Sequence, residues 1–169
     1  MLFLPQRQLT FANFQCRPGS VRARGACAGF VLGEGTAYRE PVLILAGPPG
    51  SGKTHLLHAT ANFSKTHQDE DSTSSTLTAL RLAEEVHRAL EFRDLPIWMN
   101  RFAAEDFLAI DDVDHLLHDS TASDFLLKVL QIRSSKRRKT LLTSGLSTIR
   151  SPACQLNAFL NHQTALRLT

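Results

Sequence analysis

The chain has 169 residues and a mass of 18.7 kDa, long enough for one α/β domain with a sizeable hydrophobic core. Hydrophobic residues make up 43% and charged residues 21% of the chain, which is ordinary for a soluble globular protein. The net charge of +3 and the isoelectric point near 9.0 permit contact with nucleic acid but do not argue for it strongly.

Two classes of segment are excluded. The apolar start is interrupted by Pro5, too early for a signal peptide, and no stretch approaches the length of a membrane span. Cys16, Cys27 and Cys154 are odd in number and lack close metal spacing, as expected of reduced thiols. We therefore expect a cytoplasmic protein without a membrane partner.

The chain opens with a lead-in segment, residues 1–20, in which Phe11 and Phe14 are spaced to pack against the domain. Residues 20–34 are rich in small side chains and predict a helix, although their apolar periodicity is weak. The apolar run 42–46 predicts the first buried strand of a sheet.

A complete phosphate-binding loop, or Walker A motif, follows this strand. Its residues are Gly47, Pro48, Pro49, Gly50, Ser51, Gly52, Lys53 and Thr54. The glycines let backbone N–H groups approach a phosphate closely, and the following helix points its positive dipole end at the same anion. Lys53 would reach the β- and γ-phosphates, and the Thr54 hydroxyl would ligate Mg²⁺. A glycine turn that merely joins a strand to a helix is the disfavoured alternative, because every fixed position of the motif is filled.

Alternating elements follow the loop. We predict a helix over 52–63 and a polar loop with an acidic centre over 65–75. Threonine and leucine content predicts a strand over 75–80, and apolar spacing predicts an amphipathic helix over 81–92. The stretch 93–105, which contains the single tryptophan, is ambiguous between a loop and a second short helix.

The second informative site is an apolar strand, 107–110, that ends in the paired carboxylates Asp111 and Asp112. This is a Walker B pattern. Asp111 would hold Mg²⁺ directly or through its water shell, and Asp112 would polarise an attacking water, so Lys53 and Asp112 are the predicted catalytic residues. A strand that ends in an aspartate-rich turn is the alternative, but the Walker A motif upstream favours a nucleotide site.

Three histidines near these motifs are weaker candidates. His55 directly follows Thr54 and is expected at the surface or behind the nucleotide site rather than in catalysis, and we count it among the nucleotide-binding residues. His115 and His118 have a spacing that metal ligation permits, but surface positions are favoured because no Cys or Glu cluster accompanies them.

The last predicted elements complete a sheet. Ser123 is expected to cap a helix over 123–134, and the basic turn 136–139 leads into a strand over 140–144. A solvated turn is the favoured interpretation of the basic residues, with phosphate contact to nucleic acid as the alternative. Strands that alternate with helices around a phosphate loop imply a mostly parallel, three-layer α/β fold.

Five segments carry a resemblance to the AAA+ domain of the bacterial DnaA and Hda family of replication proteins. They are residues 9–14, 38–41, 50–59, 110–113 and 142–144. The run KTHLLHA within the third segment is specific, whereas a Walker pair alone is shared by many ATPases. The resemblance implies a P-loop AAA+ fold with a five-stranded sheet, and an ATP- and Mg²⁺-dependent protein that acts in the initiation or regulation of chromosomal replication.

The resemblance also assigns a role to the end of the last predicted strand. ATPases of this class place there a polar residue, called sensor 1, that hydrogen-bonds the γ-phosphate or the attacking water. Thr143 or Ser144 would fill this position, and we count Ser144 among the nucleotide-binding residues. A strand that is simply capped by hydroxyl groups is an equal alternative.

The departures from the family bear on catalysis. Gly145 stands where the family usually has an acidic residue. The stretch 157–163 contains no arginine, whereas the comparable family segment supplies one to a neighbour's ATP, and neither Arg150 nor Arg167 fits that pattern.

We expect residues 1–169 to form a single AAA+-like domain in which 150–169 is a degenerate end, without the helical lid or the DNA-reading domain of the family. Because a transition-state arginine is worth about 10³–10⁵ in rate, hydrolysis should be weak or dependent on a partner. The expected partners are ATP or ADP and other AAA+ replication proteins, with DNA contacts weak and non-specific. The alternatives are a helicase-loader-type AAA+ ATPase and a non-catalytic nucleotide-binding module.

Overall fold

The computed structural model describes residues 3–34, 40–67, 72–145 and 155–168. Outside these ranges lie residues 38 and 39 of the family-like segment, Arg150, Cys154 and the acidic centre of the expected polar loop. Of the helices in the described ranges, none has the length and apolar character needed to cross a membrane.

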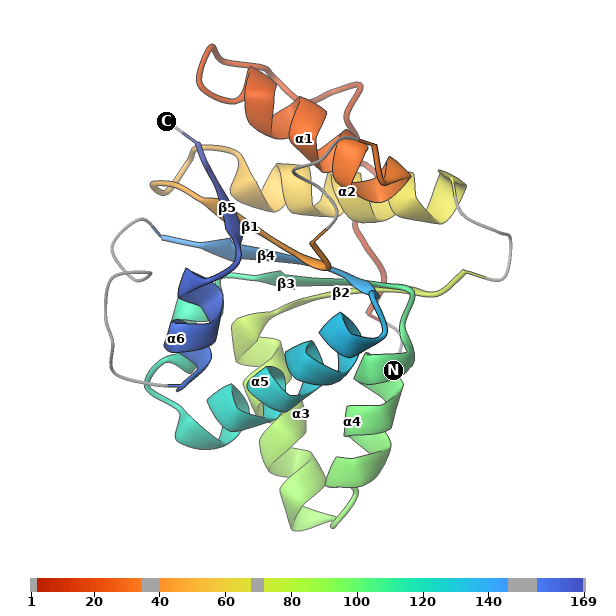
Figure 1. Ribbon diagram of the computed structural model, residues 1–169, viewed down its shortest axis with the longest axis vertical. Helices are drawn as coiled ribbons and strands as arrows, with labels where there is room; N and C mark the ends of the chain where they lie inside the picture. The colour runs from red at the N-terminus through yellow and green to blue at the C-terminus, as the bar shows by residue number, and fades with distance from the viewer. Residues whose placement is uncertain (1–2, 35–39, 68–71, 146–154, 169) are drawn as a thin grey trace.

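Helices and strands alternate along the chain (Figure 1). In chain order the elements are α1 (Val21–Leu32), β1 (Val42–Ala46), α2 (Lys53–His67), β2 (Ser74–Thr78), α3 (Ala79–Glu91), α4 (Leu95–Ala104), β3 (Phe107–Asp111), the 3₁₀ helix η2 (Val113–Leu116), α5 (Ser120–Ser135), β4 (Lys139–Ser144), α6 (Gln155–Asn161) and β5 (Thr164–Arg167). The strands form one five-stranded sheet in the order β2-β3-β4-β1-β5, and every neighbouring pair is parallel. The predicted parallel α/β fold is confirmed.

Helices cover both faces of this sheet, with α1 and α2 on one face and α3 to α6 on the other (Figure 1). Successive side chains of a strand point to opposite faces. Accordingly, Val42 and Ile44 of β1 join the hydrophobic cluster under α3, α4 and α5, whereas Leu43 and Leu45 join the cluster under α1 and α2. Burial on both faces explains why the sequence shows a continuous apolar run rather than alternation.

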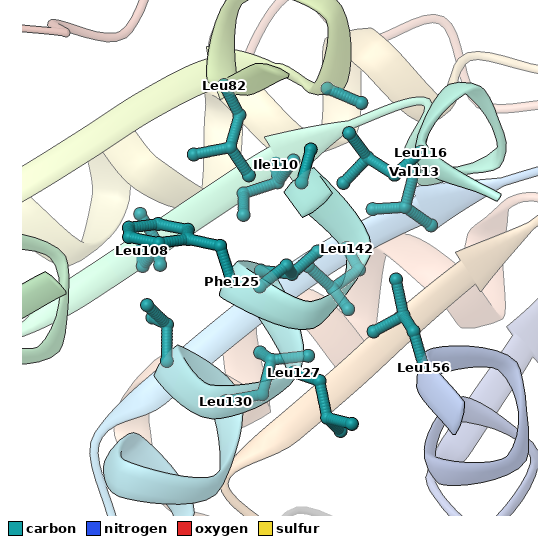
Figure 2. Packing of buried hydrophobic residues seen from close by; sticks show 14 of the residues in the cluster. Leu82, Leu108, Ile110, Val113, Leu116, Phe125, Leu127, Leu130, Leu142 and Leu156 are labelled. Atoms are coloured by element: carbon teal, nitrogen blue, oxygen red, sulfur yellow. The ribbon is translucent and has the colours of Figure 1, made fainter. Parts of the chain in front are cut away.

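The larger cluster fixes α5 against the central strands. Figure 2 shows Leu108 of β3 and Leu142 of β4 close to Phe125 and Leu130 of α5, with Leu156 of α6 at the margin. Full burial of one such side chain stabilises a fold by about 1.5–3 kcal/mol. The end of β3, where the Walker B residues lie, and the neighbouring end of β4 are therefore held by a packed layer of side chains.

The N-terminus of α5 differs from the sequence prediction. Asp119 is the N-cap residue, and its side chain accepts a hydrogen bond from the Ala122 N–H at 3.0 Å. The prediction that Ser123 caps this helix was wrong, because Ser123 lies inside the first turn and donates its hydroxyl to the Leu116 carbonyl at 2.5 Å. Aspartate and serine are comparable caps, so residue type alone could not separate the two positions.

Three other segments differ from the sequence prediction or complete it. Strand β2 ends at Thr78 because the Thr78 hydroxyl caps α3, accepting from the Arg81 N–H at 3.2 Å. Helix α2 continues to His67, beyond the predicted end at residue 63. The ambiguous stretch 93–105 contains α4, which carries a proline in its first turn.

The fifth strand could not be located from the sequence. Thr164–Arg167 pairs with β1, and the fully buried Leu168 donates its N–H to the Ala46 carbonyl at 2.7 Å. Leu156 and Leu160 of α6 belong to the larger core cluster. Residues 150–169 were expected to be a degenerate end. Their described part thus completes the sheet beside the phosphate loop.

The start of the lead-in segment packs against α4 and β2. The ring centroid of Phe3 lies 6.3 Å from that of Trp98 and 6.1 Å from that of Phe102. The Phe3 carbonyl accepts a hydrogen bond from the Thr76 N–H at 2.7 Å. These contacts tie the first described residues to the far side of the sheet from β5.

Among the residues that the structure describes, the largest fully buried side chain belongs to Arg133 of α5. Its guanidinium donates to the carbonyls of Phe102 (2.8 Å), Glu105 (2.6 Å) and Lys139 (2.6 Å) and to the Thr140 hydroxyl (2.8 Å). Burial lowers the pKa of Arg133 to about 10, so the side chain stays charged at neutral pH. Arg133 therefore joins the corner between α4 and β3 to the start of β4.

We predict that Arg133→Met lowers the free energy of unfolding by about 3 kcal/mol or more, because it leaves buried carbonyl groups without donors. Urea unfolding followed by circular dichroism measures this loss. Lys128→Met, at an exposed position of the same helix, is the control and should change stability by less than about 0.5 kcal/mol. Equal losses in the two variants would contradict the assignment.

Candidate functional site

The phosphate loop joins the end of β1 to the start of α2 at Lys53. Gly50 and Gly52 have φ values of 76° and 93°, in the left-handed region that favours glycine. A Cβ atom on Gly52 would lie 2.8 Å from the Phe14 ring, so the lead-in segment also requires glycine at this position. The structure therefore provides the strand, loop and helix that a Walker A motif requires.

Lys53 is buried against the loop, with 8% of its surface exposed. Its Nζ donates to the carbonyls of Gly47 at 2.8 Å and Pro48 at 3.1 Å. An ammonium group has three donors, so one remains for an anion in the loop. Of the other predicted loop residues, Pro48 and Pro49 are exposed and Ser51 is half-buried.

The two Walker motifs meet at Asp111, the last residue of β3, which is 6% exposed. Its Oδ2 accepts from the Thr54 hydroxyl at 2.8 Å, and its Oδ1 accepts from the Thr143 hydroxyl at 2.5 Å. The structure thus brings the two predicted Mg²⁺ ligands, Thr54 and Asp111, into direct contact. A carboxylate beside a hydroxyl suits a hard cation that also keeps water and phosphate ligands.

Asp112 follows with a left-handed backbone, at φ 54° and ψ 55°, and begins η2. Its N–H donates to the Thr143 hydroxyl at 2.8 Å, so one threonine positions both aspartates. Burial raises the pKa of Asp112, the charge of Asp111 raises it further, and Lys53 lowers it. A carboxyl with a raised pKa is better suited to accept a proton at neutral pH than an ordinary one.

A third carboxylate, that of Asp114 in η2, binds the end of β4. Its Oδ1 accepts from the Ser144 hydroxyl at 2.6 Å, and its Oδ2 accepts from the Gly145 N–H. The Ser144 carbonyl in turn accepts from the Gly47 N–H at 3.1 Å. Ser144 therefore lies beside the phosphate loop. Its hydroxyl donates to Asp114 Oδ1, and the Gly145 carbonyl, at 3.0 Å, is a second and longer acceptor. Sequence reasoning missed the contact with Asp114, because it depends on β3 and β4 lying side by side.

His55 connects α2 to the lead-in segment. Its Nε2 lies 2.9 Å from the Thr10 carbonyl oxygen and 3.2 Å from Asn13 Oδ1, and its ring packs edge-on against Phe14 with centroids 5.2 Å apart. Phe11, the other lead-in aromatic, packs on α2 through Phe63. His55 thus holds the lead-in segment against the start of α2.

A cavity of about 290 Å³ lies between the lead-in segment and the phosphate loop. Its lining residues are Asn13, Phe14, Gln15, Arg17, Gly50, Ser51, Gly52 and His55. Most of these side chains are polar or charged, and the ring of Phe14 is the apolar wall. No sequence pattern indicated Gln15 and Arg17, and only the neighbouring family-like segment 9–14 pointed to this region.

The basic turn before β4 is only partly solvated. Arg138 donates to the Ala104 carbonyl and to Asp106 Oδ1, and Lys139 Nζ donates to the Val31 carbonyl at 2.6 Å. Lys136 and Arg137 are exposed. Arg138 and Lys139 therefore stabilise the fold, and the other two residues of the basic turn are available to bind an external anion.

The remaining candidates do not form a second site. His115 and His118 are exposed, and in the part of the chain that the structure describes no three His, Cys, Asp or Glu side chains are grouped to hold a metal ion. Cys16 is an exposed free thiol. Cys27 is a buried free thiol in α1, and burial raises its pKa to about 12.

Comparison with known proteins places these features in a family context. The family model described as the bacterial DnaA ATPase domain matches residues 5–162. The chromosomal replication initiator protein DnaA of Bdellovibrio bacteriovorus is 26% identical over 138 residues, which cover 81% of this chain and 29% of that protein. The chain thus spans less than a third of the length of this relative.

Two solved structures share the fold. A replication initiator DnaA bound to AMPPCP and single-stranded DNA has a TM-score of 0.84 at 18% identity, covering 96% of this chain and 50% of that one. The DnaC helicase loader has a TM-score of 0.74 at 15% identity, covering 95% of this chain and 97% of that one. At these identities the likeness shows the fold alone.

The raised pKa of Asp112 predicts a pH-dependent effect of Asp112→Asn. The folded chain binds this proton more tightly than the unfolded chain, so the ionised carboxylate destabilises the fold once the pH exceeds its ordinary pKa. The variant should therefore be more stable than the wild type at pH 7, and its advantage should shrink as the pH falls through the carboxyl range. Asparagine tolerates the left-handed backbone at this position. Urea unfolding at several pH values tests the prediction, which a pH-independent difference would contradict.

Proposed function

Since the chain belongs to the bacterial DnaA ATPase domain family, we propose that it binds ATP and acts in the initiation or regulation of chromosome replication. The observation that carries this proposal is the hydrogen bond from Thr54 to Asp111, which joins complete Walker A and Walker B motifs at one end of the sheet. The DnaA structure that shares the fold is bound to AMPPCP, an ATP analogue, which supports a nucleoside triphosphate as the ligand.

The phosphates of ATP would lie in the loop, where three features favour an anion. The glycine backbone exposes N–H groups, α2 presents its N-terminus, and Lys53 contributes a charge. The base would occupy the cavity beside Phe14, because that cavity directly adjoins Gly50 and Gly52. His55 would hold the lead-in segment in place as one wall of the site.

Mg²⁺ would be held by Thr54 and Asp111 together with phosphate oxygens. When bound, such an ion neutralises charge that develops on the phosphates during transfer. Thr143 orients the Asp111 carboxylate through its hydroxyl, and the same threonine positions the Asp112 backbone.

Asp112 would orient the attacking water and accept its proton, which its raised pKa favours. Hydrolysis by the chain alone should be slow, because the stretch 157–163 contains no arginine to stabilise the transition state. We therefore propose a partner-dependent ATPase, with another AAA+ replication protein as the source of the missing cation.

DNA binding would be weak and non-specific. Lys136 and Arg137 are the exposed part of the basic turn, and two cations on a small surface supply only a modest, salt-sensitive attraction to phosphates. The DnaA structure bound to single-stranded DNA supports nucleic acid as a possible ligand class of this fold.

A helicase-loader-type ATPase is the second candidate. The observation that favours it is the fold, which this chain shares with the DnaC helicase loader at a TM-score of 0.74. Co-purification of the protein with a replicative helicase would support this candidate over the initiator-related function.

The first test is nucleotide binding by the wild type and by Lys53→Ala. Isothermal titration calorimetry with ATP and Mg²⁺ should show a loss of affinity of about tenfold or more, the value of a hydrogen bond from a charged group. Lys65→Ala, at an exposed position of the same helix, should bind ATP like the wild type. The site assignment fails if the wild type does not bind ATP or if Lys53→Ala binds it equally well.

The second test is steady-state ATP hydrolysis with and without a full-length DnaA protein. We expect slow turnover by the chain alone and a clear increase on addition of the partner, since a trans-acting arginine contributes about 10³–10⁵ in rate. Asp112→Asn in this chain should abolish the increase. Binding of ATP without turnover, even with the partner present, would instead indicate a non-catalytic module.

A further inference from the structure

We propose that Asp114 determines how well the site distinguishes ATP from ADP, because its carboxylate occupies two hydrogen-bond donors that would otherwise face the terminal phosphate. The inference rests on the proposed binding of ATP at the phosphate loop. It concerns a residue outside both Walker motifs, in the 3₁₀ helix that follows β3.

The two donors are the Ser144 hydroxyl and the Gly145 N–H. Asp114 Oδ1 accepts the first at 2.6 Å, and Asp114 Oδ2 accepts the second. One carboxylate therefore spans a hydroxyl and a backbone N–H, as an oxygen pair of a phosphate would. Asp114 thus behaves as an internal anion bound to the end of β4.

The donors lie where the terminal phosphate is expected. The Ser144 carbonyl accepts from the Gly47 N–H at 3.1 Å, which places the end of β4 against the first residue of the loop. Thr143, the preceding residue, donates to Asp111, one of the proposed Mg²⁺ ligands. Ligands of parallel α/β sheets bind outside the carboxyl ends of the strands, which is where these groups gather.

The negative charge of Asp114, like its hydrogen bonds, opposes the binding of a terminal phosphate. None of the ion pairs among the described residues includes Asp114, so no Lys, Arg or His side chain neutralises it through a direct contact. Asp111 and Asp112 place two further carboxylates within the same short segment. A terminal phosphate would have to displace Asp114 from its donors or bind beside an additional negative charge.

ADP lacks the γ-phosphate, which is the terminal phosphate of ATP, and does not compete with Asp114. The contact should therefore weaken the binding of ATP while leaving the binding of ADP nearly unchanged. Asp114→Asn retains the size of the side chain but removes its charge and one of its acceptor oxygens, so it should free at least one donor for ATP.

The test measures the dissociation constants of ATP and ADP, each with Mg²⁺, by calorimetry for wild type and Asp114→Asn. We expect the preference for ATP over ADP to rise about tenfold in the variant, as for one charge-assisted hydrogen bond gained. Asp124→Asn, which removes an exposed carboxylate from α5, is the control for net charge and should leave the preference unchanged. An unchanged preference in Asp114→Asn, or an equal rise in the control, overturns the proposal.

A second variant, Ser144→Ala, separates the effect of the hydrogen bonds of Asp114 from the effect of its charge. In Ser144→Ala one of the two donors is absent, so Asp114→Asn should raise the preference for ATP much less than it does in the wild type. A rise of full size in this background, with the Gly145 amide resonance unmoved by ATP, would mean that Asp114 acts only by repulsion and would overturn the displacement described here. A rise of full size with that resonance shifted would assign the displacement to the Gly145 N–H.

The wild-type chain provides a measurement that does not depend on variants. The amide resonance of Gly145 in a ¹H–¹⁵N spectrum should shift on addition of ATP and Mg²⁺ and remain nearly unchanged with ADP and Mg²⁺. Equal shifts, or none with ATP, overturn the proposal. Absence of any nucleotide binding would instead contradict the proposed function, and the calorimetry distinguishes the two failures.

Discussion

The buried carboxylate of Asp111 is the interaction on which the nucleotide site depends. A carboxylate with 6% exposure is strongly destabilising unless donors surround it, and here the donors are the hydroxyls of Thr54 and Thr143. One hydroxyl comes from the helix after the phosphate loop and the other from the neighbouring strand. The requirement to satisfy this single group therefore ties α2, β3 and β4 together at the site.

Much of the fold could be predicted because its central strands are buried on both faces. Residues 42–46 and 107–110 are continuous apolar runs, and each appears as a strand at or within one residue of the predicted bounds. Strand β2 begins one residue before its predicted start because the buried Ser74 resembles a loop residue, and it ends two residues early because Thr78 caps α3. Strand β5 is short, and its residues alternate between half-buried and exposed, so no apolar run marks it.

The candidate site could likewise be predicted only in part. Walker residues have fixed spacing and follow strands, so the contact between Thr54 and Asp111 could be anticipated from local sequence and the parallel topology. The roles of Asp114 and Arg133 could not, because both depend on tertiary neighbours. In the sequence, Asp114 is one more aspartate after a Walker B motif, and Arg133 is one more cation near a basic turn. Only the packing shows that the first binds the end of β4 and the second is fully buried.

The contact between Phe3 and Thr76 has a consequence for how copies of this protein behave toward one another. Strand β2 is terminal in the sheet, and the unpaired N–H and C=O groups of a terminal strand are a template for strands of other molecules. By supplying its carbonyl to the Thr76 N–H, the lead-in segment occupies part of that template. The lead-in segment thus covers part of the open edge of the sheet with Phe3, while its later residues contact His55 and the phosphate loop.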